Sequence, residues 1–262
     1  MTIADVAVIG GTGFYTFLDD PEQHVVETPY GAPSAPVSVG TVAGRRVAFL
    51  PRHGPHHEYP PHAIPYRANL WALRSLGVRQ VLAPCAVGGL SERVVPGDVV
   101  VPDQLVDRTF RRVPSYVESG AVHLPFADPY CPGVSAAVLA ADPAVRAGGA
   151  MVVIEGPRFS TRAESRSYAE QGWTLINMTG APEAALAREQ RMCYAAIALV
   201  TDMDAGAESG SGVGQEEVFA LFRANLERLS SLLTAAVAGL PDPRGCACST
   251  WADGIEITYD TP

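Results

Sequence analysis

The hydrophobic pattern alternates between short continuous apolar runs and segments with helical periodicity. The apolar runs predict strands that are buried on both faces of a sheet. These runs are Ile3–Ile9, Gln80–Val87, Val99–Val101, Met151–Glu155, Leu175–Asn177 and Tyr194–Asp202. Val37–Val42 and Arg45–Leu50 predict a hairpin that turns at Ala43-Gly44.

Four segments predict helices. Tyr66–Leu76 has helical periodicity and ends at Gly77, and Thr161 with Glu164 forms a capping box that starts a helix running to about Gln171. The other two are Pro182–Arg191, which proline opens, and Gln215–Ala238, a long helix with one apolar stripe.

This alternation predicts an α/β fold: a single domain over residues 1–240, with a mixed central β-sheet flanked by helices. Residues 103–132 predict an irregular loop, and a loop that long is usually functional. Residues 241–262 predict a loosely held C-terminal tail.

Composition narrows the class of protein. The 262 residues carry a formal net charge of −9, which disfavours nucleic acid or an anionic membrane as a partner. All 19 basic residues are Arg, so lysine-dependent covalent catalysis is excluded. No signal peptide or run of about 20 apolar residues is visible, and five Cys do not make a disulfide framework. We therefore expect a soluble, cytoplasmic protein.

Ligands of such sheets bind at the carboxyl ends of the strands. The chain places its chemically notable residues at these ends, in the segments Gly10–Gly13, Arg52-His53, Cys85–Gly89, Glu155–Ser160, Asn177–Thr179 and Asp202–Asp204.

The first of these segments, Gly10-Gly11-Thr12-Gly13, is a glycine loop whose N–H groups can converge on an anion. A phosphate loop and a plain tight turn both fit. Dinucleotide binding is less favoured, because the third glycine of its fingerprint is replaced by Thr16.

Arg52 and His53 offer a guanidinium fork and an imidazole donor, a pair suited to phosphate. A metal site built on His53, His56, His57 and His62 is the alternative. Their spacing matches no helical pair and no Cys or carboxylate cluster completes a tetrahedral set, so we expect solvated loop histidines and no metal.

Asp202 and Asp204 stand two apart at the end of a strand, so both carboxylates can face one ligand. Such a pair can protonate a ring nitrogen and accept from an exocyclic amine. Loop capping by one acid and solvation of the other is the alternative. Cys246 and Cys248 in the tail give a weak metal or redox signal, and we interpret them as incidental surface thiols.

From about Ile9 to about Leu233 these segments resemble the methylthioadenosine phosphorylase branch of the nucleoside phosphorylase family. The segments that carry the resemblance are Ile9–Gly13, Arg52–Gly54, His123–Pro125, Asp128–Pro132, Glu155–Ser160, Asn177–Thr179 and Thr201–Asp204.

The resemblance implies a homotrimeric pentosyltransferase that uses phosphate to cleave S-methyl-5'-thioadenosine into adenine and 5-methylthioribose 1-phosphate, with no metal or organic cofactor. Asp202 would be the catalytic acid and Asp204 would favour an amino purine. The implied phosphate site is Thr12, Arg52, His53, Cys85, Ala86 and Thr179. The implied nucleoside site is Phe159, Ser160, Asn177, Met178, Thr201, Asp202, Asp204, Gln215, Val218, Phe219 and, from a neighbouring subunit, His123.

Two positions depart from the family pattern. Cys85 stands where the family usually has Ser or Thr, and a thiol is a weaker donor to phosphate. Gln215 stands where an apolar side chain is expected near the 5′ group. Cleavage of adenosine, inosine or another 5′-modified adenosine is therefore the nearest alternative, followed by an NAD-dependent dehydrogenase and by a non-catalytic binding or scaffold protein.

Overall fold

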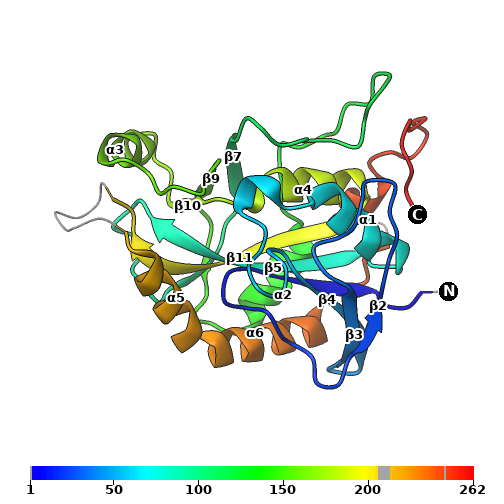
Figure 1. Ribbon diagram of the computed structural model, residues 1–262, viewed down its shortest axis with the longest axis horizontal. Helices are drawn as coiled ribbons and strands as arrows, with labels where there is room; N and C mark the ends of the chain where they lie inside the picture. Colours follow the sequence, from blue (N-terminus) through cyan, green and yellow to red (C-terminus); the bar gives the residue numbers. More distant parts are fainter. Residues whose placement is uncertain (1, 206–212, 245) are drawn as a thin grey trace.

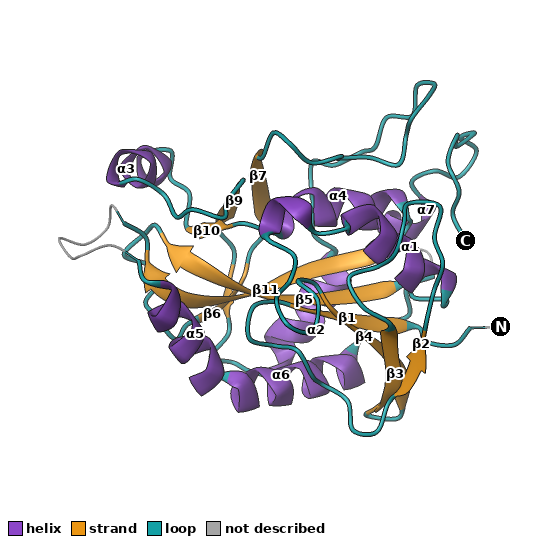
Figure 2. Ribbon diagram, viewed as in Figure 1, coloured by secondary structure: helices purple, strands orange, loops and turns teal. Residues whose placement is uncertain are grey.

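The computed structural model describes residues 2–205, 213–244 and 246–262. Within them, strands form one twisted mixed sheet that separates two groups of helices (Figures 1 and 2). The strands are β1 Val6–Gly10, β2 Glu22–His24, β3 Val37–Val42, β4 Arg45–Pro51, β5 Gln80–Gly89, β6 Val99–Val101, β7 Gln104–Arg108, β8 Arg146–Ala147, β9 Ala150–Ile154, β10 Leu175–Asn177 and β11 Cys193–Met203. The predicted α/β fold with a mixed sheet is confirmed.

Helices cover both faces of this sheet. In Figure 2, α1 and α4 lie on one face, and α2, α5 and α6 lie on the other. The helices are α1 Tyr66–Ser75, α2 Pro132–Ala141, α3 Arg162–Glu170, α4 Gly180–Glu189, α5 Gln215–Ala224, α6 Leu226–Gly239 and α7 Ala247–Thr250, with a 3-10 turn η1 at Pro61–Ala63. Each face has its own apolar core, which fits strands that are apolar on both sides. No helix in the described ranges is long and apolar enough to cross a membrane.

Strand β5 is the centre of the sheet. It pairs in parallel with β1 and β11 and, at its carboxyl end, antiparallel with β10. Three strands meet there because Gly88 has no side chain: a Cβ at this position would lie 2.9 Å from Ile176 Cγ2 and 3.1 Å from Asp202 Oδ1. The crossing brings the ends of β5, β10 and β11 to one place.

Two predictions about single elements are wrong, and one helix was not predicted. Residues 103–132 include the strand β7, which pairs in parallel with β9, so this segment is not wholly irregular. The expected helix Gln215–Ala238 is two helices, because Asn225 (φ −107°, ψ 5°) leaves helical geometry between α5 and α6. The sequence also gave no prediction for α2, a helix of small apolar residues.

The C-terminal segment 241–262 packs against the domain in its described part. Ala252 and Cys248 are buried. Trp251 Nε1 donates to Arg188 O, and Tyr259 Oη donates to Glu189 O, both at 2.8 Å. The expectation of a loosely held tail is therefore wrong, and so is the interpretation of Cys248 as a surface thiol.

Candidate active site

One cavity gathers nearly all the residues that the sequence singled out, at the carboxyl ends of β1, β4, β5, β10 and β11. Its lining includes every predicted site residue except His123: Thr12, Arg52, His53, Cys85, Ala86, Phe159, Ser160, Asn177, Met178, Thr179, Thr201, Asp202, Asp204, Gln215, Val218 and Phe219. His123 is exposed and is not part of this lining. The chain therefore does not bring His123 to its own cavity.

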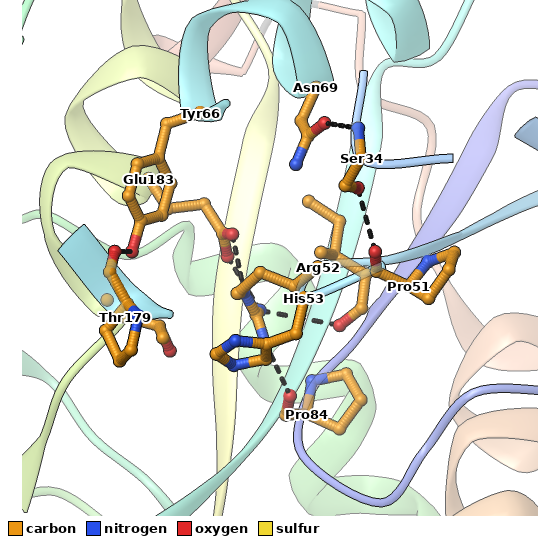
Figure 3. Close-up of polar contacts among 12 residues, drawn as sticks. Ser34, Pro51, Arg52, His53, Tyr66, Asn69, Pro84, Thr179 and Glu183 are labelled. Carbon is orange, nitrogen blue, oxygen red and sulfur yellow. Dashed lines mark hydrogen bonds and ion pairs between the residues drawn. The ribbon is translucent and has the colours of Figure 1, made fainter. Parts of the chain in front are cut away.

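Arg52, which directly follows β4, is held by Glu183 on α4. Its Nε and Nη2 donate to the two carboxylate oxygens at 2.6 and 2.8 Å, and both side chains are buried (Figure 3). Tyr194 Oη also donates to Glu183, at 2.8 Å. Nε and Nη2, the guanidinium edge that was expected to bind phosphate, thus bind Glu183. Nη1, which also donates to Pro84 O at 3.3 Å, is the end next to the Gly11 backbone.

The backbone before Arg52 is fixed as well. Ser34 Oγ donates to Pro51 O, and the Ser34 N–H donates to Asn69 Oδ1 on α1, both at 2.8 Å (Figure 3). Because these contacts hold the residue directly before Arg52, they restrain the backbone that carries the guanidinium.

The glycine loop approaches Arg52 and β5 closely. A Cβ on Gly11 would lie 2.8 Å from Pro84 O and 3.0 Å from Arg52 Nη1, so only glycine fits without displacement. The loop therefore brings its backbone and Thr12 to the same wall of the cavity as Arg52 and the end of β5.

His53 is a neutral imidazole in this structure. Its Nδ1 lies 2.8 Å from Tyr59 O, and since a carbonyl only accepts, Nδ1 carries the proton. Burial lowers the pKa of His53 to about 3, outweighing the hydrogen bond to Tyr59. The remaining nitrogen, Nε2, is then an acceptor. It can bind a protonated phosphate oxygen, in place of the donor role expected from the sequence.

Asn177 organises the junction of β10, α4 and β5. Its Oδ1 accepts from the N–H groups of Thr179 and Gly180, each at 2.7 Å, and its Nδ2 donates to Ala86 O at 3.0 Å. These contacts engage both ends of the amide, so Asn177 shapes the wall on which Thr179 and Ala86 lie.

Cys85 occupies the cavity wall as a protonated thiol. Burial raises its pKa to about 12, while the positive charge of Arg52 acts in the opposite direction. The thiol therefore offers a weak S–H donor beside Arg52, and no negative charge that would oppose an anion.

Asp202 also lines the cavity, near the end of β11. Burial raises the pKa of its carboxyl to about 6; the Thr201 hydroxyl, 2.8 Å from Oδ2, lowers it, and the nearby Asp204 and Glu217 raise it. A carboxyl with this pKa is partly protonated near neutral pH and can act as a general acid.

Asp204 is buried next to Asp202 and is positioned by its backbone, whose N–H donates to Gly89 O at 2.9 Å. Its Oδ2 is buried and has no hydrogen-bond partner among the described residues. A buried acceptor of this kind requires a donor, so the carboxylate suits a ligand with an N–H or amino group. Both Asp202 and Asp204 face the cavity, as their spacing predicts.

Several residues of the site were not assigned to it from the sequence. Glu183 and Tyr194 complete the buried network of Arg52. His57, expected to be a solvated loop histidine, lines the cavity, and its ring stacks on that of His53 with centroids 4.3 Å apart. The one available clue was chemical: an Arg directly after a buried strand needs a carboxylate partner, but the sequence does not say which.

The family follows from comparison of the whole chain. A family model described as the phosphorylase superfamily matches residues 5–238. The chain belongs to the phosphorylase superfamily. It is 58% identical over 258 residues to an S-methyl-5'-thioadenosine phosphorylase of Mycolicibacterium smegmatis, covering 98% of this chain and 99% of that protein.

Two further proteins are similar to the chain. A purine nucleoside phosphorylase of Streptomyces coelicolor is 54% identical over 270 residues, covering 97% of this chain and 96% of that protein. The solved structure of methylthioadenosine phosphorylase from Schistosoma mansoni in complex with adenine is 35% identical, with a TM-score of 0.86, covering 90% of this chain and 91% of that chain. The family match and this similarity to phosphorylases show that the chain is an enzyme of the pentosyltransferase class.

Proposed function

We propose that this enzyme cleaves S-methyl-5'-thioadenosine with inorganic phosphate, releasing adenine and 5-methylthioribose 1-phosphate. The observation that carries the proposal is the buried Asp204 Oδ2, which has no partner in the described part of the chain and lies beside the carboxyl of Asp202. An adenine ring supplies what this pair lacks: an exocyclic amine for Asp204 and a basic N7 for Asp202. A 6-oxopurine would instead oppose two acceptors in a closed site.

The residues around the base and the residues around phosphate then have different chemical roles. Asp202 donates a proton to N7, which makes the purine a competent leaving group as the C1′–N9 bond breaks. Phosphate, held by the Gly11–Thr12 backbone, Arg52 Nη1 and Thr179, stabilises the positive charge that develops on the ribose and attacks C1′. Holding both reactants in line is worth up to about 7–11 kcal/mol in well-aligned systems. We propose that no metal or organic cofactor takes part in this reaction.

Cleavage of ordinary nucleosides is the second candidate, and Gln215 favours it. This polar side chain stands on the first turn of α5 and lines the cavity together with the apolar Val218 and Phe219. Its amide can hydrogen-bond a 5′-hydroxyl, as in adenosine, whereas a methylthio group requires only the apolar residues.

The test is base release from methylthioadenosine, adenosine and inosine, each with and without phosphate. We expect adenine release that depends on phosphate and is fastest with methylthioadenosine. Faster cleavage of adenosine would establish the second candidate. Cleavage of inosine at a comparable rate would overturn the role given to Asp204, and release without phosphate would overturn phosphorolysis.

A homotrimeric assembly and a cytoplasmic location are further parts of this proposal. The segment that holds His123 also exposes Phe110 (75%) and Val113 (54%), large apolar side chains that an adjoining subunit would cover. His123 would then complete the cavity of that neighbour. Light scattering after size-exclusion chromatography tests the assembly, with a mass of three chains expected and a monomeric mass overturning it.

A further inference from the structure

Four of the five cysteines, which come from three separate segments of the chain, lie close together in space. Cys131 precedes α2, Cys193 is the first residue of β11, and Cys246 and Cys248 flank the first residue of α7. Their sulfur atoms all lie within 4.8 Å of one another, and none of the four lines the active-site cavity. The cluster is therefore a separate feature of the molecule.

The spacing of these sulfurs fits one tetrahedral ion. Zinc bound to four thiolates at about 2.3 Å holds neighbouring sulfurs about 3.8 Å apart. Cys131 Sγ and Cys246 Sγ are 3.7 Å apart. A disulfide would use two sulfurs and requires no particular position of the others, whereas a single metal accounts for the convergence of all four. Four sulfur ligands without oxygen select a soft or borderline ion such as zinc over magnesium or calcium.

Cys131 is the N-cap residue of α2, so it lies at the positive end of that helix. A sulfur at a helix N-terminus is a favourable place for a thiolate.

A buried cation lies beside the cluster. Arg188, on α4, is 8% exposed, and its backbone carbonyl accepts a hydrogen bond from Trp251 Nε1, three residues after Cys248. Its guanidinium donates to the carbonyls of Pro125, Asp128 and Pro129, and no carboxylate forms an ion pair with it among the described residues. The net charge of −2 on a zinc ion with four thiolates would be partly offset by this guanidinium.

We propose that Cys131, Cys193, Cys246 and Cys248 form a structural zinc site that fastens the C-terminal segment to α2 and β11. On binding, each thiol gives its proton to solvent and forms one sulfur–zinc bond, and no electrons are transferred. The site stabilises the packing of the segment that also carries Trp251, and it takes no part in the cleavage reaction.

The test is the metal content of the purified full-length chain, produced without an affinity tag in zinc-supplemented medium and dialysed with reductant. Elemental analysis should find about one zinc per chain. The double variant Cys246→Ser/Cys248→Ser should lose the zinc, and Cys85→Ser, which changes the one cysteine outside the cluster, should keep it. Loss of zinc should also lower Tm in the double variant relative to Cys85→Ser.

A second measurement uses the unmodified sequence, so it does not depend on the folding of a variant. Exchange of the metal for Co²⁺ should give the sulfur-to-cobalt charge-transfer band and the intense visible bands of a tetrahedral thiolate site. Absence of zinc together with absence of these bands would overturn the proposal. Intact-mass measurement before any reductant is added tests for disulfides. A mass lower by the hydrogens lost in disulfide formation would overturn the zinc site in favour of disulfides.

Discussion

The Glu183 carboxylate on α4 accepts hydrogen bonds from both Nε and Nη2 of Arg52, at 2.6 and 2.8 Å, and the two side chains are only 0% and 1% exposed. This relationship changes the role of Arg52. Its donors bind protein acceptors, and Arg52 lines the cavity with a guanidinium whose position is fixed. Glu183 is therefore a positioning residue, because its effect on a bound anion passes through Arg52.

Replacing Glu183 by Gln should destabilise the fold by about 3–5 kcal/mol, because it leaves the buried charge of Arg52 without its partner. Urea unfolding measures this loss. The variant should also raise KM for phosphate more than KM for the nucleoside. The matched control is Asp242→Asn, which breaks the exposed ion pair with Arg244 and should leave both the unfolding midpoint and the kinetics unchanged. Equal unfolding midpoints for the two variants would contradict the structural role.

Asp202→Asn should lower kcat by about 10²–10⁴-fold, because the amide cannot donate a proton to the leaving purine. Circular dichroism and thermal unfolding should show a much smaller effect on folding. Near-normal turnover in this variant would show that Asp202 is not the acid.

The pH dependence of the native enzyme follows from the same carboxyl. Burial raises the pKa of Asp202 to about 6, so the acid is protonated below that pH and loses its proton above it. We expect kcat to fall as pH rises through the pKa of Asp202 in the bound complex. This limb should be missing from the profile of Asp202→Asn. A limb of unchanged position in that variant would assign the titration to another group.

Gln215→Val should move the preference of the enzyme toward methylthioadenosine over adenosine, by about tenfold or more in the ratio of kcat/KM values. The physical reason is the loss of an amide that can bind a 5′-hydroxyl, together with the gain of apolar contact. Glu216→Val is the control, because Glu216 is exposed on the same turn of α5 and does not line the cavity. The same ratio in both variants would place Gln215 outside the 5′ pocket.

Cys85→Ser should lower KM for phosphate about 2–10-fold and leave KM for the nucleoside unchanged, because a hydroxyl is a stronger donor than a thiol. Cys85→Ala removes the sulfur without adding a donor and should leave KM for phosphate equal or higher. If both variants changed KM for phosphate in the same direction, packing rather than hydrogen bonding would explain the effect.

Local patterns in the sequence determined most of the elements and the place of the site. The hairpin of β3 and β4, the capping box of α3 and the buried strands β5 and β11 follow from turn residues, spacing and apolar runs that act over a few positions. Because ligands of α/β sheets bind at the carboxyl ends of the strands, the residues at these ends were expected to meet, and Asp202, Arg52 and Thr179 do line one cavity.

Tertiary structure decided what depends on pairs of residues remote in the chain. The partner of Arg52 is 131 positions away in the chain. Helical periodicity alone does not distinguish the buried Glu183 from a solvated glutamate on the same helix. The same holds for Cys131 and Cys246, 115 positions apart, and for the short strand β7, which is ordered by its pairing with β9. Spacing along the sequence specifies faces and ends of elements, whereas the packing of those elements selects which side chains touch.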